Sequence, residues 1–435
     1  MRKGAWIGGL VAVIGAGYVT GVYLASEQVA VQYQRYVAAL SENYRGVATV
    51  SSKVDSSFFS SANKLSLEFN DLPEPVLEWA QTNTIDFDIK FSHGFLSSHS
   101  VLTIAESELR NKINGYQVKP DKEPLLLSSD YKYDLFEGSV LVTGEFSADA
   151  FKHNSADMEL LIGSVKGPFS LLDDTFTLDF IARPSSLKVA GMEFQVAQMR
   201  LEQSAKSLTG NVLKAGLAID SEATIKIDGF KVKAQGDGLE VNGLLLEIDQ
   251  HVAGDRLVIA TNYSAEEVRI KRSSGELKFD NSVVKLSLDV DMQASVALLG
   301  DIQKLQEQGV VDVNDPAVIF PLLNGLTQKG VNLQAQRLAV SLEGSTLEGK
   351  VDLKMDPFSI EEVMLDRQAV LQKLDLEADF LLPKKLLAAL PDYDSSQLGF
   401  FVGMGFLLDE GDNYRFSISA KQGKVELNGH AMPGM

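Results

Sequence analysis

The apolar residues of this chain follow two patterns, the first of which is a long uncharged run at the N-terminus. From Gly4 to Ser26 no residue is charged, and Arg2 and Lys3 stand just before the run. About 20 apolar residues cross the hydrocarbon core of a bilayer, so the run predicts one transmembrane anchor at 4–26. Because basic residues stay on the cytoplasmic side of a membrane, residues 1–3 are predicted to form a cytoplasmic tip and the remainder to lie outside.

A cleaved signal peptide is the alternative, because it also begins with a basic tip. Cleavage needs a shorter apolar core and small residues three positions and one position before the cut. For a cut after Ala25, the third position before it is Tyr23. The sequence therefore favours an uncleaved anchor.

Small residues recur one turn apart along this predicted helix, and an apolar stripe continues beyond it. Such small residues let two helices approach closely in lipid. The stripe, at steps of three and four, predicts a juxtamembrane amphipathic helix at 27–45, which packs either on the rest of the chain or on a second copy. We expect a homodimer whose face is formed by Gly4, Gly8, Gly17, Gly21, Ala25, Val29, Tyr33, Tyr36 and Leu40.

The second pattern is an alternation of apolar and polar residues, which is typical of strands with one buried face. Ile85, Phe87, Ile89 and Phe91 show it most clearly. No proline occurs between residues 184 and 316, as expected for interior strands, which need every backbone donor. The same alternation recurs at Leu65–Phe69, Thr175–Ile181, Met192–Val196, Ile225–Val232, Leu239–Ile248, Leu257–Tyr263, Val268–Phe279, Val283–Met292, Val331–Leu342 and Leu347–Met355.

Helical patterns are few and lie in the C-terminal third. We divide the part outside the membrane into a β-rich region, 46–293, and a mixed α/β region, 294–435. A hairpin closes the chain, with its turn at Gln422-Gly423. The helices are expected at Val296–Gln308, after the cap Asp315 with an exit at Gly325 or Gly330, and at Phe358–Gln372, Pro383–Leu390 and Gly399–Met404.

The predicted fold is therefore mainly β with minor α: a long antiparallel curved sheet or a sandwich, preceded by one transmembrane helix. So many one-sided strands present a long apolar face, and the few helices cannot cover all of it. A second sheet, or an apolar molecule from outside, must cover the rest. A closed sandwich and an open groove that holds lipid both remain open at this point.

Composition excludes several functions. The 40 Lys and Arg against 59 Asp and Glu give the 435-residue chain a net charge of −19, so we expect no nucleic-acid partner. The absence of cysteine excludes disulfides, thiolate metal sites and thiol catalysis.

No residue pattern indicates catalysis or a cofactor. The five histidines are scattered, and the glycines at Gly344 and Gly349-Lys350 lie between two alternating patterns, where no helix N-terminus would face a phosphate. We therefore expect no enzyme, no metal and no cofactor. Paired carboxylates that meet in space, as in a hydrolase, stay as a third hypothesis.

Several short motifs, in order, carry a family resemblance. After Gly17–Glu27 they are Tyr44-Arg45-Gly46-Val47, His93-Gly94-Phe95, Leu374–Ala378 running into Leu382-Pro383, and Gly423–Gly429. On these the chain resembles the YdgA-like family of bacterial inner-membrane proteins, a domain of unknown function. The resemblance implies a single-pass protein of the bacterial cell inner membrane with its bulk in the periplasm, and it implies no catalytic residues.

These observations favour a non-enzymatic, membrane-anchored periplasmic protein of the cell envelope that binds or shelters lipid along a sheet. A dimeric scaffold that binds other envelope proteins is the alternative.

Overall fold

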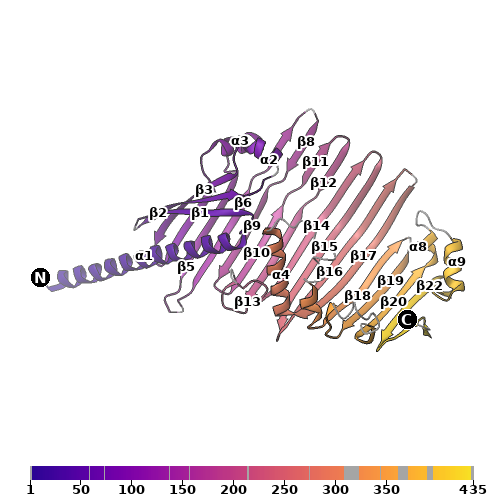
Figure 1. Cartoon of the computed structure of the whole chain (residues 1–435). Coiled ribbons are helices and arrows are strands. Elements are labelled where there is room, and N and C mark those ends of the chain that lie inside the picture. The colour runs from indigo at the N-terminus through magenta and orange to yellow at the C-terminus, as the bar shows by residue number, and fades with distance from the viewer. Residues whose placement is uncertain are drawn as a thin grey trace. The chain divides into compact units, whose positions relative to one another are not determined.

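The computed structural model describes the whole chain except residues 1, 58, 73, 137, 156, 213–214, 274, 308–322, 343, 361–370, 389–394 and 433–435. It divides into two compact units: Met1–Ser186 with Glu202–Ala215, and Leu187–Leu201 with Gly216–Met435. We call them unit 1 and unit 2 and describe each by itself. Both are built mainly of antiparallel strands (Figure 1).

Unit 1 contains the long N-terminal helix α1, Arg2–Asn43, followed by strands and two short helices. Its strands pair in the order β1, β2, β3, β4, β5, β6, β9, β10, while β7 pairs with β8, and β8 also pairs with β11. Helix α3 starts at the cap Ser107, whose hydroxyl accepts the Arg110 N–H. The elements are β1 Ala48–Ser56, β2 Ser60–Phe69, α2 Glu74–Ala80, β3 Thr84–Gly94, β4 Ser97–Ile104, α3 Glu108–Tyr116, β5 Leu125–Tyr133, β6 Val140–Ala148, β7 Phe151–Asn154, β8 Met158–Ile162, β9 Val165–Leu172 and β10 Thr175–Ala182.

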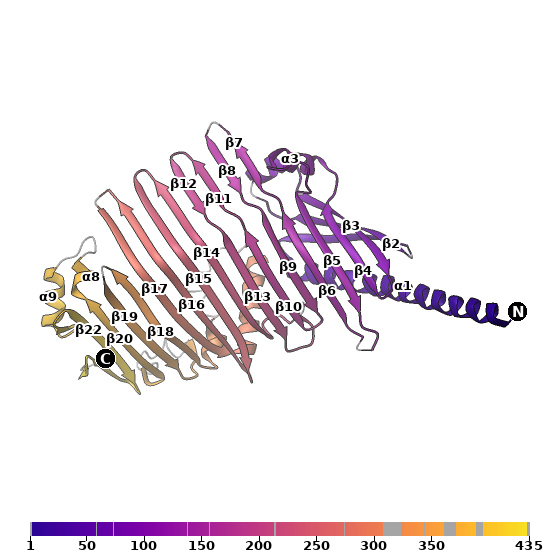
Figure 2. The same ribbon diagram turned by 180° about the vertical axis from the view of Figure 1, so that it is seen from behind.

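The core of unit 1 lies between the second half of α1 and the sheet. Val29 and Tyr33 from the helix pack with Phe91, Tyr131 and other buried residues of the strands. The first half of α1 continues past the strands (Figure 2).

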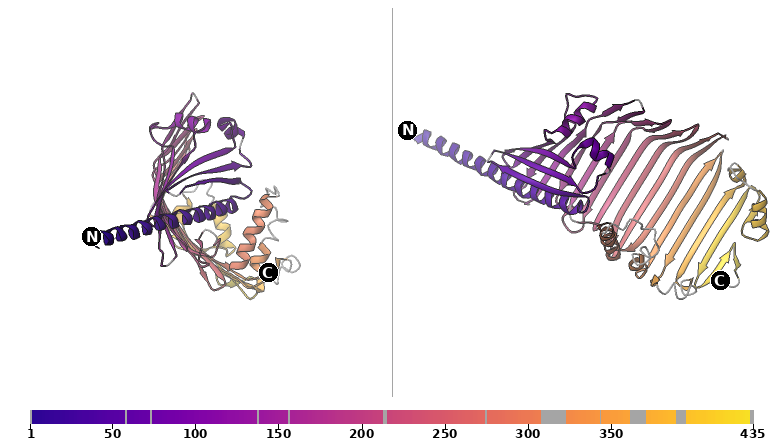
Figure 3. Two further views of the ribbon diagram at one scale, coloured as in Figure 1. Left: turned by 90° about the vertical axis from the view of Figure 1, so that its left-hand side faces the viewer. Right: turned by 45° about the horizontal axis from the view of Figure 1, so that its top comes forward.

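Unit 2 is a sheet of long strands that pair in chain order from β14 to β20, and then β20 with β22 and β22 with β23. The sheet curves, and α4 lies on the inner side of the curve (Figure 3). Strands β11 Ser185–Val189 and β13 Met199–Ser207 contain the boundaries between the units. The other elements are β12 Met192–Val196, β14 Ile219–Ala234, β15 Asp237–Ala253, β16 Arg256–Arg272, β17 Gly275–Asp291, α4 Met292–Glu307, β18 Val331–Leu342, β19 Ser345–Met355, β20 Leu374–Pro383, α8 Lys384–Ala388, α9 Ser395–Gly403, β21 Leu408–Glu410, β22 Asn413–Lys421, β23 Lys424–Leu427 and β24 His430–Ala431.

The mainly β fold with a large antiparallel sheet and a few helices is confirmed. Helix α4, the short helices α8 and α9, and the final hairpin also form where the sequence predicts them. Gln422 and Gly423 have φ of 51° and 78°, as a two-residue hairpin turn requires. The helix expected after Asp315 is described only at its end, where residues 323–327 are helical. Its first part, and most of the helix expected at Phe358–Gln372, lie outside the described residues.

One expected strand is wrong in its limits. Val268–Phe279 is not a single strand, because a turn at Ser273 and Gly275 divides it between β16 and β17. The glycine has φ of 147°, a value that side-chain-bearing residues avoid.

The expected transmembrane anchor at 4–26 is not supported by the structure. Among the helices of the described residues, none reaches the combination of length and hydropathy that a membrane span needs.

Candidate functional site

One face of the unit 2 sheet carries a continuous row of apolar side chains. Residues directly opposite each other in an antiparallel pair point to the same side of the sheet. Following the register from β14 to β22 gives one row with a single interruption: Ile225, Leu246, Tyr263, Val284, Leu338, Gly349, Phe380 and Phe416. The interruption, Gly349, is filled by its neighbour, because a Cβ there would lie 2.4 Å from the Phe380 ring.

A second row runs beside the first on the same face. It consists of Ala223, Ile248, Thr261, Leu286, Ala335, Val351, Ala378, Ile418 and Leu427. Strands lie about 4.8 Å apart, so each row is about 34 Å long from β14 to β22. We call the two rows together the apolar stripe.

The apolar stripe is only partly covered. Tyr263 is 41% exposed, and Leu246, Val284 and Phe380 are partly exposed. Helix α4 contacts β16 and β17, and α8 contacts β19 and β20. In the described part of unit 2, the stripe therefore lies on a sheet that is not closed into a sandwich.

The opposite face of the same strand segments is polar. From β14 to β18 its side chains, in register, are Thr224, Glu247, Asn262, Lys285 and Arg337, and from β18 to β20 they are Gln334, Asp352 and Glu377. Asn262 donates a hydrogen bond of 2.6 Å to the Glu247 carboxylate. The two faces therefore differ sharply in the chemistry they offer to a ligand.

Toward the far ends of β14–β17 the apolar residues shift by one position, beyond Gly243 and Asn281, where the backbone has φ of 60° and 50°. There Phe230, Val241, Val268 and Phe279 are in register. The residues between them form ion pairs, such as Lys231 with Glu240, Arg269 with Glu267, and Lys278 with Glu267.

Of these charged residues, Lys231, Glu240 and Arg269 line a hollow of about 620 Å³. Hydrogen bonds from Lys278 and then Arg269 hold the pKa of Glu267 down at about 2. A carboxyl group with so low a pKa is a poor proton carrier near neutral pH. Glu267 therefore acts as a member of an ion-pair network.

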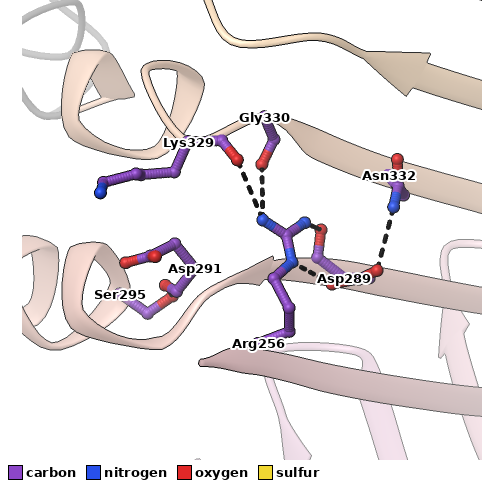
Figure 4. Close-up of polar contacts among 7 residues, drawn as sticks. All are labelled: Arg256, Asp289, Asp291, Ser295, Lys329, Gly330 and Asn332. Carbon is purple, nitrogen blue, oxygen red and sulfur yellow. Dashed lines mark hydrogen bonds and ion pairs between the residues drawn. The ribbon is translucent and has the colours of Figure 1, made fainter. Parts of the chain in front are cut away.

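A polar cluster ties β16, β17 and the start of β18 together beside α4 (Figure 4). Arg256 donates from Nε to Asp289 Oδ1 at 2.7 Å and from Nη2 to the Asp289 carbonyl at 2.8 Å. Its Nη1 reaches the carbonyls of Lys329 and Gly330 at 3.0 and 3.2 Å. Asn332 donates to the other Asp289 oxygen at 2.9 Å. The guanidinium and both carboxylate oxygens are thus engaged, as in a structural clamp.

Figure 4 also shows Asp291 and Ser295 at the start of α4. The Asp291 carboxylate accepts the Ala294 N–H at 2.8 Å, and the Asp291 carbonyl accepts the Ser295 hydroxyl at 2.7 Å. This side chain caps the helix. Directly before it, Val290 and its partner Leu257 are almost fully buried, so the sheet is best covered where α4 starts.

In unit 1, His93 lies in a small hydroxyl cluster. Its Nε2 is 3.1 Å from the Ser61 hydroxyl and its Nδ1 is 2.9 Å from the Ser98 hydroxyl. Burial lowers the pKa of His93, so the ring is neutral near neutral pH. Both ring nitrogens are thus paired with hydroxyl groups, and the arrangement is that of a buried, hydrogen-bonded structural histidine.

The structure describes the side-chain surroundings of only some of the predicted anchor residues. Arg2, Lys3, Gly4, Gly8 and Gly17 belong to α1, but their side-chain surroundings lie outside the described residues.

The later residues of the predicted dimer face pack within the chain. Ala25, Val29 and Tyr33 are buried, and Tyr36 and Leu40 pack against the unit 1 core. Of the two alternatives for this stripe, packing on the chain's own sheet is the one observed.

Gly21 is also used within unit 1. A Cβ at this position would lie 2.2 Å from the Phe95 ring, and the Gly21 carbonyl accepts the Leu96 N–H at 3.5 Å. Because Gly21 has no side chain, α1 can approach the β3–β4 turn closely at this position.

Among the described residues, no group of three or more His, Cys, Asp or Glu side chains could hold a metal ion.

Comparison with known proteins gives a family without an assigned activity. A family model described as "Bacterial protein of unknown function (DUF945)" matches residues 1–434. The chain belongs to this family. No curated protein and no solved structure matches it. The narrower YdgA-like name stays a prediction.

The sequence indicated the apolar strands of this DUF945 protein but not their registration into one stripe. The clamp at Arg256 was not predicted either, because its partners are 33 and more residues away in the sequence. Strands β5 and β6 of unit 1, which are separated by the exposed Leu135-Phe136 turn, were not predicted from the sequence.

Proposed function

We propose that this DUF945 protein is a non-enzymatic protein of the bacterial cell envelope that shelters lipid acyl chains on the apolar stripe of unit 2. The observation that carries the proposal is the stripe itself: two adjacent rows of apolar side chains, in continuous register, on a sheet that the described helices cover only in part. Large exposed apolar surfaces on a folded protein mark sites for apolar partners.

The dimensions of the stripe suit a lipid. Its length of about 34 Å, from the strand spacing, is similar to the hydrocarbon thickness of a bilayer, about 30 Å. Burial of one methylene group is worth about 0.8 kcal/mol, so ten methylenes laid on the stripe with half of their surface covered would gain about 4 kcal/mol. Several chains side by side would bind firmly.

The location is proposed from the sequence. The uncharged run at 4–26, preceded by Arg2 and Lys3, supports a single inner-membrane anchor with the bulk of the chain in the periplasm. The net charge of −19 disfavours nucleic acid as a partner. An anchored protein with an apolar sheet surface would be well placed to take up lipid from the membrane.

The dimeric scaffold has less support, because Val29 and Tyr33, which were expected to face a second copy, are buried in unit 1.

Native mass spectrometry of the full chain, extracted in a mild detergent, tests the lipid proposal. We expect co-purified lipid, and we expect Leu286→Asp to lose it, because the new charge would lie in the middle of the stripe. Ser287→Asp is the matched control, since the next residue points to the polar face. A wild-type protein that carries no lipid under these conditions would refute the proposal.

A further inference from the structure

Three hairpin turns of unit 1 present exposed apolar tips at one end of its sheet. Phe59 lies in the turn between β1 and β2, Phe95 in the turn between β3 and β4, and Leu135 and Phe136 in the turn between β5 and β6. All four are more than half exposed, and the Phe136 side chain is fully exposed. We call these four residues the turn cluster. Because β1, β3 and β5 all run in the same direction, their turns lie at the same end of the sheet.

The β3–β4 turn of the cluster contacts α1 near the point at which the helix leaves the sheet. The rings of Tyr18 and Phe95 are stacked with their centroids 6.2 Å apart. The Leu96 N–H donates to the Gly21 carbonyl, and the Tyr133 N–H donates to the Leu96 carbonyl at 3.1 Å. These contacts join the β3–β4 turn to the helix and to Tyr133, the last residue of β5.

The first turn is joined to the same group. The His93 N–H donates to the Phe59 carbonyl at 2.9 Å, and the His93 ring holds Ser61 next to that turn. In Figure 2 the first half of α1 extends away from this end of the strands. Backbone hydrogen bonds therefore link the three turns to one another and the β3–β4 turn to α1.

We propose that the turn cluster inserts into the interfacial layer of the lipid bilayer and forms a collar around the anchor. This inference rests on the proposed membrane anchor and adds the depth at which the protein sits. It also fixes the outer limit of the span: because Gly21 contacts the β3–β4 turn, the part of α1 in the hydrocarbon ends near Thr20, not at Ser26.

The length of the helix agrees with this placement. Residues 4–20 of α1 extend for about 26 Å at 1.5 Å per residue, slightly less than the hydrocarbon thickness of about 30 Å. The turn cluster then lies at the bilayer surface, where aromatic side chains are favoured. Tyr18 and Tyr23, both about half exposed, would lie at the same level.

The aqueous alternative leaves the cluster unexplained. A fully exposed Phe136 at the tip of a turn gains nothing from the fold, whereas insertion removes its ring from water. Two hydrogen bonds support the backbone on either side of this ring: the Asp134 carboxylate accepts the Phe136 N–H at 2.8 Å, and the Asp134 carbonyl accepts the Gly138 N–H at 2.9 Å.

The test uses depth-dependent quenching in vesicles of phosphatidylethanolamine and phosphatidylglycerol. The chain has no cysteine, so Phe136→Cys and Asp121→Cys each give one labelling site in the full-length protein. Asp121 is exposed and precedes β5 at the end of the strand opposite to Phe136. Each variant carries an environment-sensitive fluorophore, and the vesicles contain lipids with a nitroxide either near the headgroup or deep in the acyl chain.

We expect the label at residue 136 to lose most of its fluorescence with the shallow nitroxide and less with the deep one. The label at residue 121 should respond to neither and should be quenched by aqueous iodide. Equal exposure of both labels to iodide, in protein that stays with the vesicles after an alkaline wash, would overturn the collar and leave the anchor intact. Loss of the protein in that wash would overturn the anchor and the collar together.

Discussion

Replacement of Arg256 by alanine tests whether the clamp beside α4 holds this end of the unit 2 sheet. The change removes four hydrogen bonds: one to the Asp289 carboxylate and three to backbone carbonyls, at 2.7 to 3.2 Å. Arg256 and Asp289 are 25% and 31% exposed, so water can replace part of what is lost.

The magnitude follows from these contacts. After screening by solvent, the ion pair is worth about 1 kcal/mol, and each carbonyl bond contributes about 0.5–1 kcal/mol. The sum is about 3 kcal/mol, which corresponds to a roughly 100-fold change in a local opening equilibrium. Arg256→Lys keeps the charge but loses the planar fork, so it should recover only part of the difference.

Hydrogen exchange measured by mass spectrometry is the appropriate assay, because the change is local. We expect the amides of Asn332 and Leu333, at the start of β18, to exchange roughly 100-fold faster in Arg256→Ala, as the opening free energy above implies. Arg415→Ala is the control: Arg415 also binds an aspartate, Asp379, through two of its nitrogens, but it is about half exposed. If Arg256→Ala leaves exchange at β18 unchanged, or if Arg415→Ala has an equal effect on its own strands, the reasoning is refuted.

Three further predictions concern unit 1. Leucine at Gly21 should displace the Phe95 ring, destabilise the β3–β4 turn by about 1–3 kcal/mol and increase proteolysis there, whereas alanine at the unobstructed Gly300 should not. Val29→Ala should lower the stability of unit 1 by about 2 kcal/mol through the cavity it leaves, while Val31→Ala, on the exposed side of α1, should have little effect on the thermal unfolding temperature. Burial lowers the pKa of His93, so as the pH falls the unfolded state binds a proton before the folded state does. Thermal stability should therefore fall as the pH falls below about 6.5, and His93→Gln should weaken this dependence. An equally steep pH dependence in the variant would exclude His93 as its source.

The sequence was most informative where the alternation was regular. Strands such as β3 and β19 follow it closely. It misled where the alternation shifts by one position within a strand. In β16 the apolar residues are Leu257, Ile259 and Tyr263 in the first part, but Val268 and Ile270 in the second. Such a change of phase is typical of two strands, but here both parts belong to one strand, and its register with β15 and β17 is the same before and after the change.

The sequence could predict that the sheet has an apolar face, but not which residues meet on it. Alternation shows that each strand has an apolar side, but the stripe depends on registers such as Tyr263 opposite Val284, which pair residues from different strands. Sequence patterns also could not decide between the two partners for the Val29–Tyr33 helix surface, because a surface of this kind packs equally well on a sheet or on another helix. The missed strand β1 is rich in serine, so its apolar side was too weak to recognise.

Photo-crosslinking from inside the stripe tests the proposed function most directly. A benzophenone amino acid at Leu246 would face the proposed lipid, and the same residue at the adjacent Glu247 would face the polar side. After irradiation of intact bacteria, mass spectrometry of the full chain should show lipid adducts for position 246 and none for position 247. Absence of lipid adducts at position 246, or equal yields at both positions, would contradict the proposal that this face of the sheet carries lipid.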